Sequence, residues 1–186
     1  MPDAWLVAGP PGGGKSTLAP PLARRLDAAL LDRDTATAPL TRVVARLLGT
    51  APDDLDDPRL RVALGEAAYE SVLAAAGDTL SLGRAVVVVA PFTRALADAG
   101  AARSVQQQLR GAGLRVVWVD CPPEERRRRM QARGAPRDAR KLIAPRLEAA
   151  VPPAVPHAVV DGRDGLDRQL RAALQAPLAL RPSAPQ

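Results

Sequence analysis

Short apolar runs rich in valine, leucine and alanine alternate along the chain with longer stretches whose apolar residues recur at helical spacing. The short runs predict five strands, at residues 5–8, 29–31, 85–90, 114–119 and 157–160. The longer stretches predict helices at residues 15–26, 40–48, 59–76, 101–109, 123–133, 138–150 and 165–176. Strands that alternate with helices in this way are typical of β-α-β units. The pattern therefore predicts an α/β fold built on a parallel sheet.

Turn residues and prolines indicate where the elements and the domain end. Glycines that follow predicted helices, where a left-handed backbone closes the last turn, are Gly49, Gly77, Gly111 and Gly134. From residue 177 the chain is rich in proline, and we expect residues 177–186 to form a disordered tail. No repeat or linker interrupts the remainder, so residues 1–176 are predicted to form a single domain.

A glycine-rich segment, "GPPGGGKS", lies between the first predicted strand and the first predicted helix and fits the pattern G-x-x-x-x-G-K-[ST]. Glycines are needed there because the backbone must turn its N–H groups inward around a phosphate. The helix that follows directs its N-terminal dipole at the same anion. Lys15 adds a charge that reaches the β- and γ-phosphates, and Ser16 offers its hydroxyl to Mg²⁺. The residues predicted to bind the nucleotide are Gly9, Gly12, Gly13, Gly14, Lys15, Ser16 and Thr17.

The lysine of this motif differs from the rest of the basic residues. Arginine supplies 24 of the 26 basic side chains, yet position 15 is lysine. A slim ammonium group suits a crowded phosphate site better than a broad planar guanidinium. The alternative is a glycine-rich turn that matches by accident, which we expect in about one of a thousand chains of this composition. The motif therefore predicts phosphate binding.

Composition limits the kinds of protein that the chain can be. At 186 residues it can bury a core without a disulfide or a structural metal. The single cysteine, Cys121, cannot form an internal disulfide, and the single histidine, His157, excludes a His/Cys zinc site. Because no run of eighteen apolar residues and no secretion signal occurs, we expect a cytoplasmic protein with no membrane partner. The aromatic content of 2% argues against a base-stacking surface for single-stranded nucleic acid.

The net charge of +6 comes from one segment. Residues 121–146 carry nine basic and three acidic side chains, and the rest of the chain carries seventeen of each. This local concentration predicts a site for a compact polyanion, or a solvated helix face, rather than a surface that coats nucleic acid.

Five segments together resemble the P-loop kinases of the small-molecule and polynucleotide-kinase group. They are "GPPGGGKST", "LLDRDT", "VVVVAPFTR", "VWVDCPPEERRRRMQARG" and "RDARKL", spread over residues 4–162. Within this group, the chain resembles most the compact actinobacterial proteins known as AAA family ATPases. The resemblance implies a three-layer α/β/α sandwich, with five parallel strands in the order 2-3-1-4-5 and a helical lid over about residues 126–141. It also implies ATP and Mg²⁺ as cofactors and transfer of the γ-phosphate to a hydroxyl.

Two carboxylates follow the second predicted strand, in the stretch "LLDRD". In an extended backbone Asp32 and Asp34 point to the same side, at the sheet edge where ligands bind. By resemblance to kinases with Asp-x-Asp at this place, Asp34 accepts the proton of the acceptor hydroxyl and Asp32 holds Mg²⁺ through water. The alternative is that one or both carboxylates cap the helix that follows.

The metal site is open to a second interpretation. Asp120 ends the apolar run "RVVWVD" and is another candidate for contact with the metal. The third predicted strand has no acidic residue at its end, where many relatives carry Asp near the position of Val89. If Asp32 does not compensate, the protein would bind nucleotide but turn over slowly.

The basic segment matches the lid of this kinase class, whose arginines close over the phosphates. Helical spacing places Arg126, Arg129 and Arg133 on one face. By resemblance, Arg133 and Arg137 are lid residues that stabilise the charge of transfer, and Arg129 and Arg140 are weaker candidates. The alternative is a solvated arginine face.

The predicted function is therefore a kinase that phosphorylates a hydroxyl of a small metabolite. Arg94, Arg42 and Arg46 are candidates for holding the acceptor, or are surface residues. A 5'-hydroxyl polynucleotide kinase stays open because of "DRDT" and the basic lid. An ATP-binding protein or ATPase without transfer stays open because of the third strand. A GTPase is disfavoured because the chain has no asparagine for an N-K-x-D motif.

Overall fold

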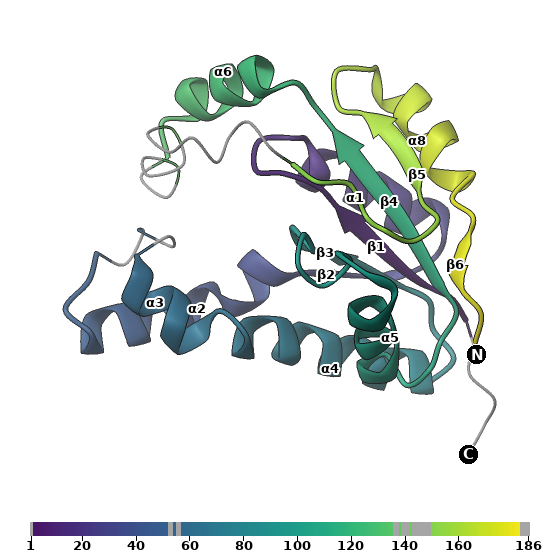
Figure 1. Cartoon of the computed structure of the whole chain (residues 1–186), viewed down its shortest axis with the longest axis horizontal. Helices are drawn as coiled ribbons and strands as arrows, with labels where there is room; N and C mark the ends of the chain where they lie inside the picture. The colour runs from purple at the N-terminus through teal and green to yellow at the C-terminus, as the bar shows by residue number, and fades with distance from the viewer. Residues whose placement is uncertain are drawn as a thin grey trace.

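A parallel sheet forms the centre of the molecule (Figure 1). The computed structural model describes residues 2–51, 54, 57–135, 138, 142 and 150–182. Within them, parallel strands are hydrogen-bonded in the order β2-β3-β1-β4-β5. They are β1 Ala4–Ala8, β2 Ala29–Asp32, β3 Val86–Val89, β4 Leu114–Asp120 and β5 Ala158–Asp161. This order confirms the predicted fold class.

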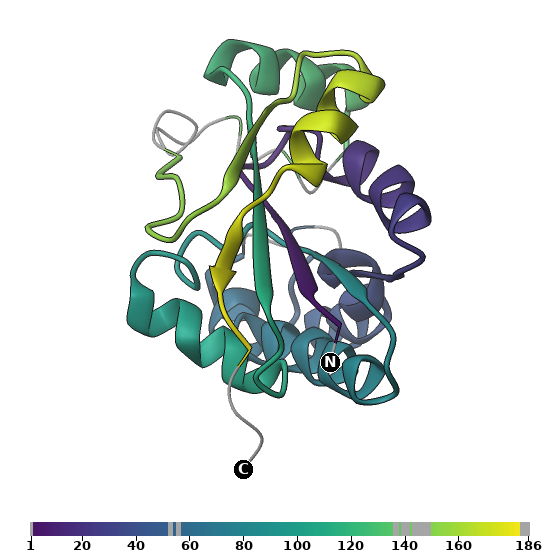
Figure 2. The ribbon, with the colours of Figure 1, turned by 90° about the vertical axis from the view of Figure 1, so that its right-hand side faces the viewer.

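Helices cover both faces of the sheet, as the side view in Figure 2 shows. They are α1 Lys15–Arg25, α2 Arg33–Leu47, α3 Pro58–Leu64, α4 Ala67–Ser81, α5 Ala99–Gln108, α6 Pro123–Arg133 and α8 Leu166–Leu174. Side chains of the central strand β1 alternate between the two cores, because successive residues of a strand point to opposite faces. Leu6 is buried in the core formed with α4 and α5, and Val7 in the core formed with α1 and α8. Three layers result.

The junction between β2 and α2 differs from the predicted one. We expect a helix from residue 40, but α2 begins at Arg33, directly after the last residue of β2. Asp32 ends the strand and caps the helix, because its Oδ1 accepts a hydrogen bond of 3.0 Å from the Thr35 N–H. A carboxylate at this position satisfies an N–H group that has no partner within the helix. The predicted helix at 138–150 lies outside the described residues, apart from its positions 138, 142 and 150.

One of the four predicted helix-ending glycines has another role. Gly49, Gly111 and Gly134 have the positive φ expected after a helix. The prediction is wrong for Gly77, which is buried inside α4. A Cβ at Gly77 would lie 2.7 Å from the main-chain oxygen of Gln108, so its small size allows α4 to approach the end of α5.

Gly77→Ala is expected to lower the free energy of unfolding by about 1–2 kcal/mol, because the added methyl meets a backbone atom that cannot rotate away. Urea unfolding measures the change. Gly165→Ala is the matched control, since a Cβ there meets nothing within 4 Å. A Gly77→Ala variant more stable than the wild type, as helix propensity alone predicts, would contradict the packing role.

The segment after residue 176 also departs from the prediction. Leu178–Leu180 form β6, which pairs antiparallel with the start of β4. In β4, β5 pairs only with residues 117–120, so the first half of β4 has an edge without a neighbour on that side. β6 covers this edge. Gln106 Nε2 supports the strand by donating a hydrogen bond of 2.7 Å to the Arg181 oxygen. The expected disordered tail is therefore wrong for these three residues, and the described sheet has six strands.

Candidate active site

At Gly9 the loop between β1 and α1 lies against the end of β4 with no room for a side chain. Gly9 has a φ of 140°, and a Cβ there would lie 2.5 Å from the Val119 oxygen. Gly14 is the N-cap of α1, with a φ of 110° that favours glycine. No side chain caps this helix, and its first turn holds no acidic residue. The amides and the dipole at the start of α1 are therefore available to an anion.

Lys15 bends back over this loop. Its Nζ donates hydrogen bonds of 2.8 Å to the Gly9 oxygen and 2.9 Å to the Pro10 oxygen. The ammonium group therefore lies against the turn that leads into the N-terminus of α1. Ser16 and Thr17, the next two residues of α1, are exposed. One short segment thus brings together a positive charge, main-chain donors and a hydroxyl, which is the combination that a phosphate with a bound cation requires.

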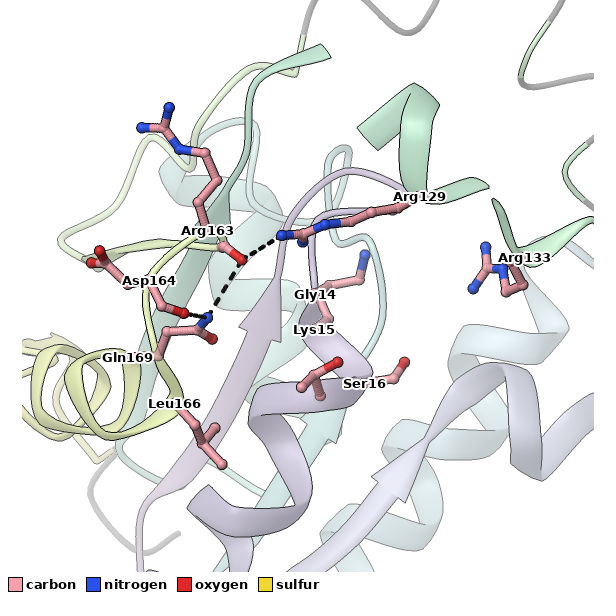
Figure 3. Close-up of a pocket in the computed structure, with 12 residues that line it drawn as sticks. Gly14, Lys15, Ser16, Arg129, Arg133, Arg163, Asp164, Leu166 and Gln169 are labelled. Carbon is pink, nitrogen blue, oxygen red and sulfur yellow. Dashed lines mark hydrogen bonds between the residues drawn. The ribbon is translucent and has the colours of Figure 1, made fainter. Parts of the chain in front are cut away.

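A cavity of about 450 Å³ opens beside the loop, as Figure 3 shows. The start of α1 forms one wall, and the other walls come from α6 and from the turn between β5 and α8. The lining residues are Gly12, Gly14, Lys15, Ser16, Thr17, Arg129, Arg133, Gly162, Arg163, Asp164, Leu166 and Gln169. The volume is in the range of small-molecule and cofactor sites. The cavity therefore lies between the predicted phosphate-binding loop and part of the basic segment.

Arg129 connects three elements at this cavity. Its Nε donates to Glu125 Oε1 at 2.7 Å, and its Nη2 donates to the Gly162 oxygen at 2.9 Å. A longer bond of 3.4 Å runs from Nη1 to the oxygen of Gly13 in the loop. Hydrogen bonds from Arg128 and Arg129 lower the pKa of Glu125 from 4.5 to about 2. The predicted arginine face is therefore not simply solvated, since Arg129 fixes α6 to the loop and to the β5–α8 turn.

The Glu125 carboxylate is expected to make stability depend on pH. Because its pKa is lowered to about 2 in the folded protein, its stabilising effect is complete above pH 4.5 and is lost as the pH falls toward 2. The gap in unfolding free energy between wild type and Glu125→Gln should therefore shrink between pH 5 and pH 2. Urea unfolding across this range measures it. A gap that stays constant or widens at low pH would contradict the assignment.

Arg133 lies at the cavity, as the lid prediction requires, but is engaged with an acidic residue. Its Nε donates to Asp138 Oδ2 at 2.9 Å, and its Nη2 pairs with the same oxygen. The Asp138 side chain is buried. The other predicted lid residues, Arg137 and Arg140, lie outside the described residues.

Asp34 does not share an extended backbone with Asp32, so the predicted side-by-side arrangement is wrong in its geometry. Because α2 begins at Arg33, Asp34 lies in the first helical turn. Its carboxylate accepts a hydrogen bond of 2.6 Å from Arg33 Nη2 and is about half exposed. The capping alternative holds for Asp32, whose Oδ1 binds the Thr35 amide.

A small cluster that the sequence analysis missed supports Asp34. The Arg33 guanidinium lies 4.7 Å from the centre of the Tyr69 ring, in cation–π contact. The Tyr69 hydroxyl accepts a hydrogen bond of 3.2 Å from the Phe92 N–H, and burial raises the pKa of the phenol. Phe92 has a φ of 52°, which is unusual for a bulky residue and is common near functional sites. The signal was present in the sequence, because Tyr69 and Phe92 are the single tyrosine and the single phenylalanine.

The two other positions considered for a metal, Asp120 and Val89, lie on different strands. Asp120 ends β4 on the side of β5, and its Cα pairs in register with that of Asp161. Val89 ends β3, and its register partner is Asp32. Asp32, at the end of β2, therefore lies beside the end of β3, which has no carboxylate of its own. Among the residues that the structure describes, no group of three or more His, Cys, Asp or Glu side chains is placed to hold a metal.

The three arginines considered for the acceptor, Arg42, Arg46 and Arg94, are exposed, and none of them lines the cavity. Their part in holding the acceptor stays a prediction. In the described part of the chain, no helix has the length and apolar character that crossing a membrane requires.

Comparisons with known proteins agree with this architecture. A family model described as an AAA domain, AAA_33, matches residues 5–150. A shikimate kinase from Corynebacterium glutamicum is 29% identical over 147 residues, which cover 79% of this chain and 70% of that protein. The fold is similar to a sugar kinase from Janibacter sp. HTCC2649, at 17% identity and a TM-score of 0.63 over 94% of this chain and 93% of that chain. It is also similar to a gluconokinase from Sinorhizobium meliloti 1021, at 20% identity and a TM-score of 0.59 over 93% and 90%. The finer resemblance to actinobacterial AAA family ATPases stays a prediction.

Proposed function

Because the chain belongs to the AAA_33 family, we propose that it is an ATP-dependent kinase that moves the γ-phosphate of ATP to a hydroxyl of a small molecule. One observation carries the proposal. The glycine loop, with the Lys15 ammonium against it, opens on a cavity of about 450 Å³. The Asp34 carboxylate lies just beyond the end of β2, at the same edge of the sheet. The similarity to a shikimate kinase supports an alcohol as the acceptor.

The triphosphate would lie in the loop. The N-terminal amides of α1 and the amide after Gly13 would donate to its oxygens, and Gly9 would let the loop close against β4. Lys15 would exchange its two main-chain acceptors for β- and γ-phosphate oxygens. The nucleoside would extend into the cavity between α1, α6 and the β5–α8 turn.

The residues near the γ-phosphate fit a magnesium ion in part. The hydroxyls of Ser16 and Thr17 are exposed at the start of α1, and the first of these would hold Mg²⁺ together with phosphate oxygens. Asp32 would contribute through water, because Oδ1 caps α2 while the carboxylate has a second oxygen. When bound, the ion neutralises charge on the transferring phosphate.

Asp34 would accept the proton of the acceptor hydroxyl as that oxygen attacks the γ-phosphate. Its ion pair with Arg33, which itself lies on the Tyr69 ring, holds the carboxylate at the start of α2. Arg133 and Arg137 would then stabilise the transferring phosphate from the lid. For Arg133 this requires the ion pair with Asp138 to open.

Measuring ATP consumption against a panel of acceptors tests the proposal. The panel contains shikimate and gluconate, because similar proteins act on such hydroxyl compounds, and further sugars, amino acids, antibiotics and nucleic-acid 5' ends. The proposal predicts that at least one small hydroxyl compound raises turnover and gains a phosphate, seen by mass spectrometry. Turnover with nucleic-acid ends, with binding that falls steeply with salt, would favour a polynucleotide kinase instead. Hydrolysis that no acceptor changes would favour an ATPase without transfer.

A further inference from the structure

One side chain in the cavity wall is held in a single orientation. Gln169, on α8, is only 6% exposed and lines the cavity. Its Nε2 donates hydrogen bonds of 2.7 Å to the Asp164 oxygen and 3.4 Å to the Gly162 oxygen, as Figure 3 shows. Both partners are carbonyl groups, which only accept. The amide therefore cannot exchange its nitrogen and oxygen without losing both bonds.

The other end of this amide has no partner. Gln169 Oε1 is buried and receives no hydrogen bond. Among the residues that the structure describes, it is the one buried side-chain nitrogen or oxygen atom without a hydrogen-bond partner. A buried acceptor without a donor is costly and uncommon in folded proteins. Since the oxygen belongs to a residue of the cavity wall, a ligand that carries an N–H group can supply the missing donor after a small adjustment of that wall.

The turn between β5 and α8, whose carbonyl groups accept from Gln169, is itself fixed on several sides. The Gly162 oxygen also accepts a bond of 2.9 Å from Arg129 Nη2, and the Gly162 N–H donates to the Asp120 oxygen at 2.7 Å. The Arg163 N–H donates to Asp161 Oδ1 at 2.8 Å. The Gln169 amide is therefore already oriented before any ligand arrives, and only the wall that covers Oε1 has to adjust.

We propose that Gln169 Oε1 recognises the nucleotide base by accepting a hydrogen bond from the exocyclic amine of adenine. The inference rests on the proposed function for one point, that a nucleotide binds with its phosphates in the glycine loop. Its base then extends into the cavity, one wall of which is Gln169. Adenine carries an amino group at its 6-position, whereas hypoxanthine and guanine carry a carbonyl oxygen there. Such an oxygen would oppose Oε1, and a site built for one hydrogen bond discriminates strongly against a ligand that cannot form it.

Equilibrium binding of nucleoside diphosphates tests the inference without any acceptor. The probes are ADP, IDP and the diphosphate of purine riboside, which lacks the amine and keeps the ring. Wild-type protein should bind ADP about tenfold or more tightly than either analogue. In Gln169→Met these differences should fall to about twofold or less. Gln106→Met is the matched control, because Gln106 is also buried and donates to two main-chain oxygens, away from the cavity. It should keep the wild-type preference.

The outcomes separate the inference from the proposed function. If wild-type protein binds none of the three probes, the nucleotide site itself is wrong. If ADP binds and Gln169→Met keeps the full preference over purine riboside diphosphate, Gln169 does not recognise the amine. Should Gln169→Met fail to fold, the side-chain amide resonances of Gln169 in the wild type replace it. ADP should shift them much more than purine riboside diphosphate does, and equal shifts would overturn the inference.

Discussion

Lys15→Ala is expected to lower ATP-dependent turnover by about 10³-fold or more, the scale on which single cations act in phosphoryl transfer. The ammonium group donates hydrogen bonds to the oxygens of Gly9 and Pro10, and in the proposed complex it moves onto the β- and γ-phosphates. Removing it leaves the loop without its charge at the place where negative charge gathers. The fold should persist, because β1 and α1 are held by the cores on either side of the sheet.

A coupled assay of ADP release measures this loss, and circular dichroism checks the fold. Arg24→Ala, an exposed basic residue in the last turn of the same helix, is the matched control and should leave turnover within about twofold. Lys15→Arg is expected to be impaired as well, because a planar guanidinium does not fit where the ammonium lies. Lys15→Ala turnover close to wild type would exclude a role of the ammonium group in transfer, and an unfolded variant would mean that the loop is structural.

Asp34→Asn should lower kcat by about 10² to 10⁴-fold, the usual range for losing a general base. The affinity for ATP should change little, since Asp34 lies on α2, while the loop and the cavity that would hold the nucleotide are built from other elements. Kinetics at saturating acceptor, with ADP binding measured separately, distinguish the two effects. Equal losses in kcat and in nucleotide affinity would exclude Asp34 as the base.

Asp32→Asn is the informative comparison for that variant. Asparagine caps helices about as well as aspartate, so the cap on Thr35 should survive while the charge is lost. The expected result is a higher Mg²⁺ requirement with a smaller loss of kcat at saturating Mg²⁺. A pattern identical to that of Asp34→Asn would mean that the two carboxylates do not have separate roles.

The parts of the fold that sequence could predict are those with strong local signals. The glycine loop, the buried valines of β3 and the helix after Pro122 each follow from residue types whose backbone preference and burial agree. The strand order came through the resemblance to P-loop kinases, because periodicity does not say which strands are neighbours. The order that the structure shows agrees with it.

The errors arise where a tertiary contact overrides a local signal. A glycine such as Gly77 is typical of a helix end, but here its lack of a side chain allows α4 to pack close to Gln108. The strand at Leu178–Leu180 lies among prolines and forms because β4 has an open edge beside it. Neither the open edge nor the approaching helix is visible in a local pattern.

The candidate site also contains residues that a local signal marks and residues whose role depends on the tertiary structure. Lys15, Ser16 and Arg133 could be found because a motif or a charge cluster marks them, and all three line the cavity. The predicted geometry of Asp32 and Asp34 is wrong because the Asp32 cap starts a helix where the sequence predicts an extended chain. Gln169 carried no signal, since its importance depends on which carbonyl groups the fold places beside its amide.

The position of the phosphates in a crystal of the protein with Mg²⁺ and a non-hydrolysable ATP analogue would show whether the glycine loop binds the nucleotide. We expect the triphosphate in the loop of residues 9–16, with Lys15 Nζ on the β- and γ-phosphates and the base in the cavity between α6 and the β5–α8 turn. Phosphates bound elsewhere, or a loop closed over Lys15 with the analogue absent at saturating concentration, would contradict it.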